Sequence, residues 1–318
     1  MAEVSVILPN YNHGSYLKKR IDSILTQSFQ AFELIILDDC SSDNSREVIE
    51  RYRGHPKVAR IEYNEVNSGS PFIQWSKGIQ YAGADLIWIA ESDDGCESSF
   101  LEKTVLKMKE YASVGIVYVQ SIEFEEKSNK TFVSFQDHPL FSKSFDSSYF
   151  ETGKMEIARH LVYENTIPNA SGVLFRKDIY LKCGGVDETM RLCGDWYLWT
   201  KMLFESDIYF LAEPLNHFRL TSISARSRYS LIQTLHERLT VLHFIKEHNI
   251  HVPEKTGREL IRRLFNSYKL SQIKIPVRSV LAERKLIDNP KREIAEAIFL
   301  SLFARIRRKL TGPVMLLA

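Results

Sequence analysis

The sequence lacks the features that define several protein classes. Its 318 residues contain only four cysteines, Cys40, Cys96, Cys183 and Cys193, and their spacing matches no metal-binding pattern. We therefore expect reduced thiols in a cytoplasmic protein, without a disulfide framework. No apolar stretch approaches the ~18 residues that a membrane span needs. The opening apolar run is short and has no basic segment before it, so we expect no secretory leader.

Net charge is also small, but it is unevenly distributed. The formal charge is +2 for the whole chain. Residues 255–318 contain fifteen Lys and Arg against five Asp and Glu, a net +10, which leaves −8 for the first 254 residues. Basic patches interleaved with aromatic residues are missing outside this tail, and we therefore expect no nucleic-acid partner.

Strands and helices alternate through the first 120 residues. Helical spacing predicts a helix from Ser15. Ser41 and Ser42 are expected to cap the next helix, Ser70-Pro71 to start a third, and Ser98 to open a fourth. Such β-α units predict an α/β fold, a mostly parallel sheet with helices on both faces. The stretch 125–155 is expected to be a long loop, and the chain after Arg228 to be helical. The expected strands are 4–9, 33–39, 57–63, 85–90, 115–124, 170–176 and 208–220.

Three of the predicted strands end in polar or acidic residues. These ends are Pro9-Asn10-Tyr11-Asn12, Asp38-Asp39 and Glu91-Ser92-Asp93-Asp94. The carboxyl ends of parallel strands line one crevice where ligands bind, so we expect the three clusters to meet. Carboxylates two positions apart after a buried strand can hold Mg²⁺ or Mn²⁺. The alternative is that Asp93 and Asp94 only begin a turn.

Four segments together resemble the family 2 glycosyltransferases, which have the GT-A fold. They are "VSVILPNYN", "FELIILDDCSSDNS", "ADLIWIAESDDG" and "GDW", and the resemblance covers roughly residues 3–225. It implies a GT-A domain at 1–227 followed by a helical, basic extension at 228–318. It also implies a nucleoside diphosphate sugar as donor.

The resemblance assigns roles to particular residues of this sequence. Pro9, Tyr11 and Asp39 would surround the base and ribose of the nucleotide, with Asp38 supporting the loop. Glu91-Ser92-Asp93 resembles the DxD motif, so that Glu91 and Asp93 would contact the nucleotide. Asp93 would also bind Mg²⁺ or Mn²⁺, and the ion would neutralise charge on the leaving diphosphate.

The acceptor side rests on the segment "CGDWYLW". Asp195 matches the acidic residue that acts as general base in the inverting members of the family. Its alternative is a structural role as the N-cap of the helix that follows. Trp196 and Ser171 are the expected acceptor contacts.

Two departures from the family pattern concern the donor site. Glu91 replaces the aspartate that many relatives have. Gln74-Trp75-Ser76 replaces an Ala-Arg-Asn run, so a basic contact to the diphosphate is either absent or supplied from elsewhere.

The basic tail contains one amphipathic segment, residues 294–310. Phe299, Leu302, Phe303 and Ile306 fall on one helical face, with arginines on the flanks. Such a helix can lie on an anionic membrane, which would make the protein peripheral on the inner face. The alternative is packing on its own domain or on a second subunit.

The sequence as a whole predicts an inverting, metal-dependent glycosyltransferase. It would transfer sugar to a glycan or lipid-linked acceptor, in cell-surface polysaccharide biosynthesis. A nucleotidyltransferase is the rival in chemistry, but it needs a Gly-rich basic phosphate loop, and "PNYNHGSY" after the first strand is not one. A non-catalytic protein that binds nucleotide sugars or serves as a scaffold is the second alternative.

Overall fold

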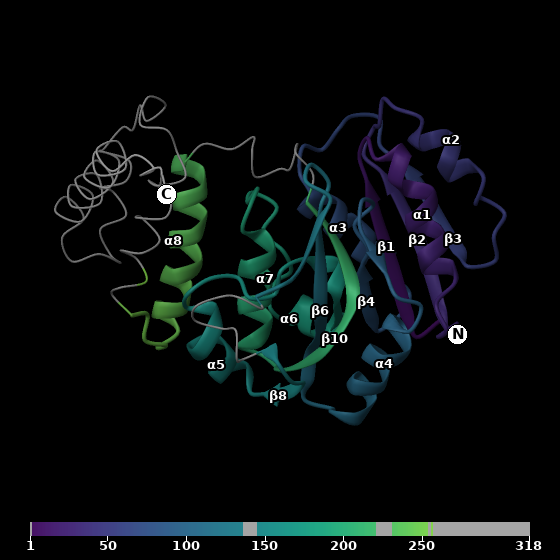
Figure 1. Ribbon diagram of the computed structural model, residues 1–318. Coiled ribbons are helices and arrows are strands. Elements are labelled where there is room, and N and C mark those ends of the chain that lie inside the picture. Colours follow the sequence, from purple (N-terminus) through teal and green to yellow (C-terminus); the bar gives the residue numbers. More distant parts are fainter. Residues whose placement is uncertain (1, 136–144, 221–230, 254–255, 257–318) are drawn as a thin grey trace, which may run out of the picture. The chain divides into compact units, whose positions relative to one another are not determined.

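The computed structural model describes residues 2–135, 145–220, 231–253 and 256 (Figure 1). The chain divides into two compact units, Met1–Ser227 and Arg228–Ala318. Helix α8 (Leu231–Glu247) belongs to the second unit. The amphipathic segment predicted at 294–310 lies outside the described residues. No helix in the described ranges combines the length and hydrophobicity needed to cross a membrane.

One mixed sheet forms the centre of the first unit (Figure 1). Its main path has the order β3-β2-β1-β4-β9-β6-β10-β5, with β7 paired to β6 and β8 to β10. The strands are β1 (Val4–Asn10), β2 (Phe32–Asp38), β3 (Val58–Tyr63), β4 (Leu86–Ile89), β5 (Gly95–Cys96), β6 (Val114–Glu125), β7 (Lys130–Val133), β8 (Tyr149–Glu151), β9 (Val173–Arg176) and β10 (Asp207–Leu220).

Strand direction determines where the site lies. Strands β1 to β4 are mutually parallel, and β10 is parallel to β6. Strand β9 is antiparallel to both β4 and β6, so β6 and β10 point the same way as β1. The carboxyl ends of β1, β2 and β4 therefore share one edge of the sheet, as the sequence predicts.

Helices cover both faces of this sheet. Those of the first unit are α1 (Gly14–Leu25), α2 (Ser45–Glu50), α3 (Pro71–Tyr81), α4 (Phe100–Glu110), α5 (Gly153–Glu156), α6 (Lys177–Lys182) and α7 (Gly194–Leu203), with a π-helical turn at Ile157–Leu161 and a 3₁₀ turn at Ala170–Gly172. Helices α1, α2 and α4 pack on one face of the sheet, and α3, α6 and α7 pack on the other.

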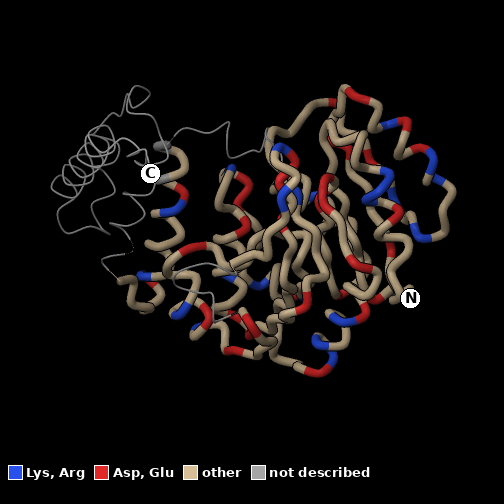
Figure 2. The backbone as a smooth tube through the Cα atoms, in the orientation of Figure 1, with Lys and Arg blue, Asp and Glu red and all other residues tan. Residues whose placement is uncertain are grey.

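Alternation along β1 shows how the two layers are built. Val6 and Leu8 face α1, whereas Ile7 faces α3. A Cβ on Gly78 of α3 would lie 2.3 Å from Ile7 Cγ2, so only glycine allows α3 to approach the strand this closely. Residues of both charge signs are spread over the elements of this unit (Figure 2), and two intrahelical ion pairs are Lys18–Asp22 and Lys107–Glu110.

Three local expectations from the sequence are wrong. Helix α2 has Asn44 as its N-cap, because Ser41 and Ser42 instead hydrogen-bond to the loop after β1. Helix α4 begins after Ser99 and not at Ser98. The predicted loop at 125–155 contains β7 and β8, since β6 continues to Glu125 and pairs with β7 as a hairpin.

Candidate functional site

The ends of β1 and β2 are joined directly by side chains. Asn10 Nδ2 donates to Asp38 Oδ1 at 2.7 Å, and the Ser41 amide donates to Asp38 Oδ2 at 3.0 Å. Asp38 is 3% exposed, so both of its oxygens are used inside the protein. Asp38 therefore supports the loop, as the sequence analysis expects.

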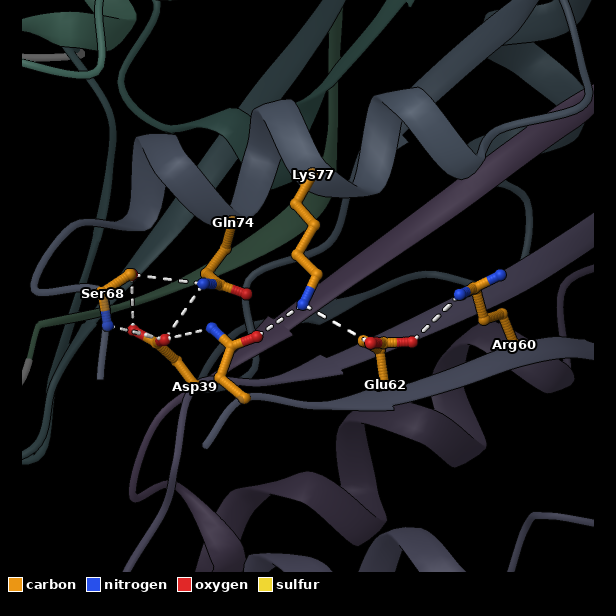
Figure 3. A network of polar contacts seen from close by, with 7 residues as sticks. Asp39, Arg60, Glu62, Ser68, Gln74 and Lys77 are labelled. Carbon is orange, nitrogen blue, oxygen red and sulfur yellow. Dashed lines mark hydrogen bonds and ion pairs between the residues drawn. The ribbon is translucent and has the colours of Figure 1, made fainter. Parts of the chain in front are cut away.

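The neighbouring Asp39 is the centre of a larger network (Figure 3). Its Oδ1 accepts from Asn64 Nδ2 at 2.6 Å, from the Ser68 amide at 2.9 Å and from Gln74 Nε2 at 3.0 Å. Its Oδ2 accepts from Ser68 Oγ at 2.7 Å and from Asn67 Nδ2 at 3.2 Å. A carboxylate offers about four lone-pair positions. Asp39 is thus saturated by the protein and holds the β3–α3 loop in place.

A basic group stands at the outer end of the same network. Lys77 Nζ on α3 donates to Asn64 Oδ1 at 2.6 Å and lies 3.6 Å from Glu62 Oε1 (Figure 3). The Asn64 amide consequently points its NH₂ group at Asp39.

The two remaining residues expected around the base lie at the end of β1. Pro9 is buried in that strand, whereas Tyr11, just after it, is 40% exposed.

The third cluster follows β4 and is held by residues of three other segments, the 3₁₀ turn, α3 and the loop after β1. The Glu91 amide donates to Ser171 Oγ at 3.1 Å, and Trp75 Nε1 donates to Glu91 Oε1 at 2.8 Å. Ser92 Oγ lies 2.8 Å from His13 Nδ1. The His13 contact connects the end of β4 to the loop after β1, so all three polar strand ends meet.

The two aspartates of this cluster differ in their surroundings. Asp94 is 6% exposed, and its Oδ1 accepts the backbone N–H of Arg219 at 2.9 Å. Arg219 Nε donates to the backbone oxygen of Asp93 at 3.0 Å. The Asp93 carboxylate makes no hydrogen bond or ion pair within the described part of the chain, and it is only partly buried. Asp93 is therefore the carboxylate that remains available to a ligand.

Electrostatics at this strand end favour a positive ligand. Burial, followed by the negative charge of Asp93, raises the pKa of Glu91 to about 8. Burial, followed by the charge of Asp93, also raises the pKa of Asp94. A cation near these carboxylates would lower both pKa values, because it favours the charged forms of Glu91 and Asp94.

The residues present fit a divalent ion that is shared with a diphosphate. The free Asp93 carboxylate offers hard oxygen ligands, which Mg²⁺ and Mn²⁺ prefer. No three His, Cys, Asp or Glu side chains gather into a metal site among the described residues. An ion here would thus need oxygens from the substrate as well as from Asp93.

Asp195 lies in the first turn of α7. The N-cap of that helix is Cys193, so the alternative of Asp195 as N-cap does not hold. Asn165 Nδ2 donates to Asp195 Oδ2 at 3.0 Å, and the Trp196 amide donates to Oδ1 at 2.7 Å. The Asp195 carboxylate is therefore oriented by fixed donors and is only partly buried.

The two expected acceptor contacts, Trp196 and Ser171, are both buried in this structure. Trp196 is 2% exposed, and Ser171 is fully buried. The Ser171 hydroxyl accepts the Glu91 amide, and its backbone oxygen accepts Trp88 Nε1 at 2.8 Å. Ser171 joins the 3₁₀ turn to β4 and leaves no surface for a sugar. Trp196 belongs to the core.

Several residues that shape the site are not predictable from the sequence. Trp75 departs from the family pattern, yet it holds Glu91. The guanidinium of Arg219 lies 4.7 Å from the ring centroid of Tyr16, and its side chain is 21% exposed. His13 and Asn165 carry no signal in one sequence, because their partners are 79 and 30 positions away.

Comparison with known proteins places this site in a family. The model of the family described as "Glycosyl transferase family 2" matches residues 5–182. The chain belongs to that family. The three polar strand ends and the acid cluster lie within the matched residues, whereas Asp195 and β10 follow them.

Curated relatives match over part of their length. The chain is 35% identical over 107 residues to "Putative teichuronic acid biosynthesis glycosyltransferase TuaG" of Bacillus subtilis, covering 34% of this chain and 42% of TuaG. It is 29% identical over 185 residues to "Poly(ribitol-phosphate) beta-N-acetylglucosaminyltransferase TarP" of Staphylococcus aureus, covering 56% of this chain and 50% of TarP. The matched region thus spans about half or less of these relatives.

Solved structures confirm the GT-A fold. TarS 1-349 of S. aureus in complex with UDP aligns with a TM-score of 0.68 and 15% identity, covering 96% of this chain and 92% of that chain. The mannosyltransferase PcManGT of Pyrobaculum calidifontis, in complex with GDP-Man and Mn²⁺, aligns with a TM-score of 0.56 and 14% identity, covering 98% and 81%. At these identities the likeness concerns the fold alone.

Proposed function

We propose that this protein is an inverting glycosyltransferase that moves a sugar from a nucleoside diphosphate sugar to a hydroxyl of a glycan or lipid-linked acceptor. Cell-surface polysaccharide biosynthesis is the proposed setting. The observation that carries the proposal is the meeting of three polar strand ends around one unpaired carboxylate, Asp93, in a chain of this family.

The relatives' names support this chemistry. TuaG is named for teichuronic acid biosynthesis, and TarP for transfer of N-acetylglucosamine to poly(ribitol-phosphate). Structural neighbours were solved with UDP, UDP-GlcNAc, and GDP-Man with Mn²⁺. Both uridine and guanosine diphosphate sugars therefore belong in a first donor panel.

The proposed donor site lies at the ends of β1, β2 and β4. Tyr11 offers its exposed ring to the base, and Pro9 and Asp39 form the floor of that pocket. Asp93 and Glu91 face the ribose and diphosphate, with Asp93 as the ligand of Mg²⁺ or Mn²⁺. A bound ion would neutralise charge on the leaving diphosphate. Arg219, above Asp93, supplies the basic contact that Trp75 does not.

Asp195 is the proposed general base. Its carboxylate takes the proton from the acceptor hydroxyl as that oxygen attacks the anomeric carbon. The two hydrogen bonds from Asn165 and from the Trp196 amide hold it in one orientation. Because the leaving diphosphate is already charged, no second catalytic carboxylic acid is needed, unlike in a glycoside hydrolase.

The tail and the compartment stay predictions. The proposed cytoplasmic location, with membrane contact through residues 294–310, depends on a segment outside the described residues. The unit 228–318 would then serve as a basic extension to the transferase domain at 1–227.

A donor screen tests the proposal. The full chain would be incubated with uridine and guanosine diphosphate sugars, with Mn²⁺, with Mg²⁺ or with EDTA, and release of nucleoside diphosphate would be measured. We expect metal-dependent release with one donor. Binding of a donor without any turnover would favour the non-catalytic alternative, and release of inorganic pyrophosphate from a nucleoside triphosphate would favour a nucleotidyltransferase.

A further inference from the structure

A charged residue, Arg20, occupies a core position of α1. It lies three positions after Leu17 and four before Ile24, on the apolar face of the helix. Its side chain is fully buried, like those of both neighbours. An arginine on such a face requires a reason, because arginine keeps its charge at all ordinary pH values.

The Arg20 guanidinium is poorly satisfied by hydrogen bonds. Its Nε, Nη1 and Nη2 atoms have no oxygen or nitrogen acceptor within the described part of the chain, and the guanidinium contacts the Cys96 thiol, whose pKa it lowers against the larger effect of burial. The Arg20 Cζ lies 5.1 Å from the ring centroid of buried Trp88, which gives a cation–π contact. That contact alone is small compared with the cost of burying a charge. The compensating negative charge must come from nearby carboxylates.

The acid cluster supplies that negative charge. The positive charge of Arg20 lowers the pKa values of both Glu91 and Asp94, against the larger effect of burial. Helix α1 is anchored at the same place, since Gln27 Nε2 donates to the Glu97 backbone oxygen at 2.8 Å and contacts Cys96 Sγ at 3.3 Å. Arg20 thus packs against Trp88 of β4, the strand that leads into the acid cluster, and its charge acts on Glu91 and Asp94 of that cluster.

The acid cluster has more negative groups than the positive group buried near it. It contains three carboxylates, Glu91, Asp93 and Asp94, against the one guanidinium of Arg20. A buried positive charge opposes the entry of a bare cation and attracts an anion, and the burial of Arg20 and Asp94 strengthens both effects. The charge of Arg20 does not oppose a divalent cation that enters the site already bound to a diphosphate.

We propose that Arg20 is a positioning residue for the donor: its buried charge weakens binding of a bare divalent cation and favours the diphosphate, so that metal and nucleotide bind together. This inference rests on the proposed function, because it assigns the diphosphate to the Asp93 side of the cluster. It needs no direct contact between Arg20 and the donor.

The test compares Arg20→Met, Arg20→Lys and Lys19→Met. Lys19→Met removes a positive charge from the same helix, but from an exposed position. Calorimetry at one mildly alkaline pH and low salt would measure binding of Mn²⁺ alone, and of UDP and GDP with and without Mn²⁺. We expect Arg20→Met to bind bare Mn²⁺ about tenfold more tightly and the metal-free diphosphate about tenfold more weakly. Arg20→Lys and Lys19→Met should stay near the wild type.

The opposite signs of the two changes are decisive. A merely structural role for Arg20 predicts that both affinities fall together, and equal affinities in Arg20→Met and wild type would also overturn the inference. If Arg20→Met does not fold, Arg20→Gln removes the same charge with a polar end and is judged by the same criterion. If the wild type binds no nucleoside diphosphate, the proposed function fails, while the Mn²⁺ measurement still tests the charge of Arg20.

Discussion

Trp75 Nε1 donates a hydrogen bond of 2.8 Å to Glu91 Oε1, and thereby connects helix α3 to the acid cluster after β4. Trp75 and Glu91 are the two positions at which the resemblance to family 2 glycosyltransferases predicts other residues. In this structure the Glu91 carboxylate reaches the indole, and the indole N–H fixes it.

The first prediction follows from this contact. Trp75→Phe removes the indole N–H but keeps an aromatic ring, which leaves the buried Glu91 oxygen without its donor. Trp199→Phe is the matched control, because Trp199 is equally buried and its Nε1 has no hydrogen-bond partner among the described residues. We expect Trp75→Phe to lose about 1–3 kcal/mol more unfolding free energy than the control. Equal losses in urea denaturation would show that the hydrogen bond adds nothing.

Much of this arrangement was predictable from the sequence, and the limits have physical reasons. Apolar runs predicted the strands β1, β2 and β4, and the rule for parallel strand ends predicted that Asp38, Asp39 and Asp93 share one edge. Helix caps were less predictable, because Ser41 found a partner in the loop after β1. The burial of Trp196 and Ser171 depends on packing between β4, α7 and the 3₁₀ turn, which no local pattern encodes.

The second prediction separates two roles of Asp39. Asp39→Ala leaves the hydrogen-bond donors of Ser68, Asn64 and Gln74 without their acceptor. We therefore expect this variant to lose about 1–3 kcal/mol of unfolding free energy. If Asp39 also accepts from the base, nucleotide affinity falls by a similar amount. Ser68→Ala removes one donor but leaves the carboxylate, so it should lose stability with little loss of affinity. Thermal unfolding and calorimetry on both variants check this. If nucleotide affinity falls in parallel with stability in both variants, Asp39 only holds the loop and does not contact the base.

The third prediction concerns the metal. Asp93→Ala should abolish the metal dependence of donor binding and leave the melting temperature unchanged, because its carboxylate has no partner within the described chain. Asp94→Ala should instead lower the melting temperature, since it removes the buried acceptor of the Arg219 amide. Donor affinity with Mn²⁺ and with EDTA would be measured for each. Unchanged Mn²⁺ dependence in Asp93→Ala would remove Asp93 as the metal ligand.

The last prediction concerns Asp195. Asp195→Asn keeps the size of the side chain, and the helix keeps its N-cap at Cys193, so the melting temperature should barely change. The amide cannot take the acceptor proton. General-base catalysis typically contributes 10²–10⁴-fold, so kcat should fall by about that factor.

Donor binding should survive in this variant, because Asp195 lies on α7 and the proposed donor residues follow β1, β2 and β4. A loss of kcat without a rise in KM is the signature of an interaction made only in the transition state. Asn165→Ala is the matched control. It removes the donor to Asp195 Oδ2 but keeps the carboxylate, so its kcat should fall much less than that of Asp195→Asn. A fully active Asp195→Asn enzyme would show that the base is another acid, because an amide at this position cannot accept the proton.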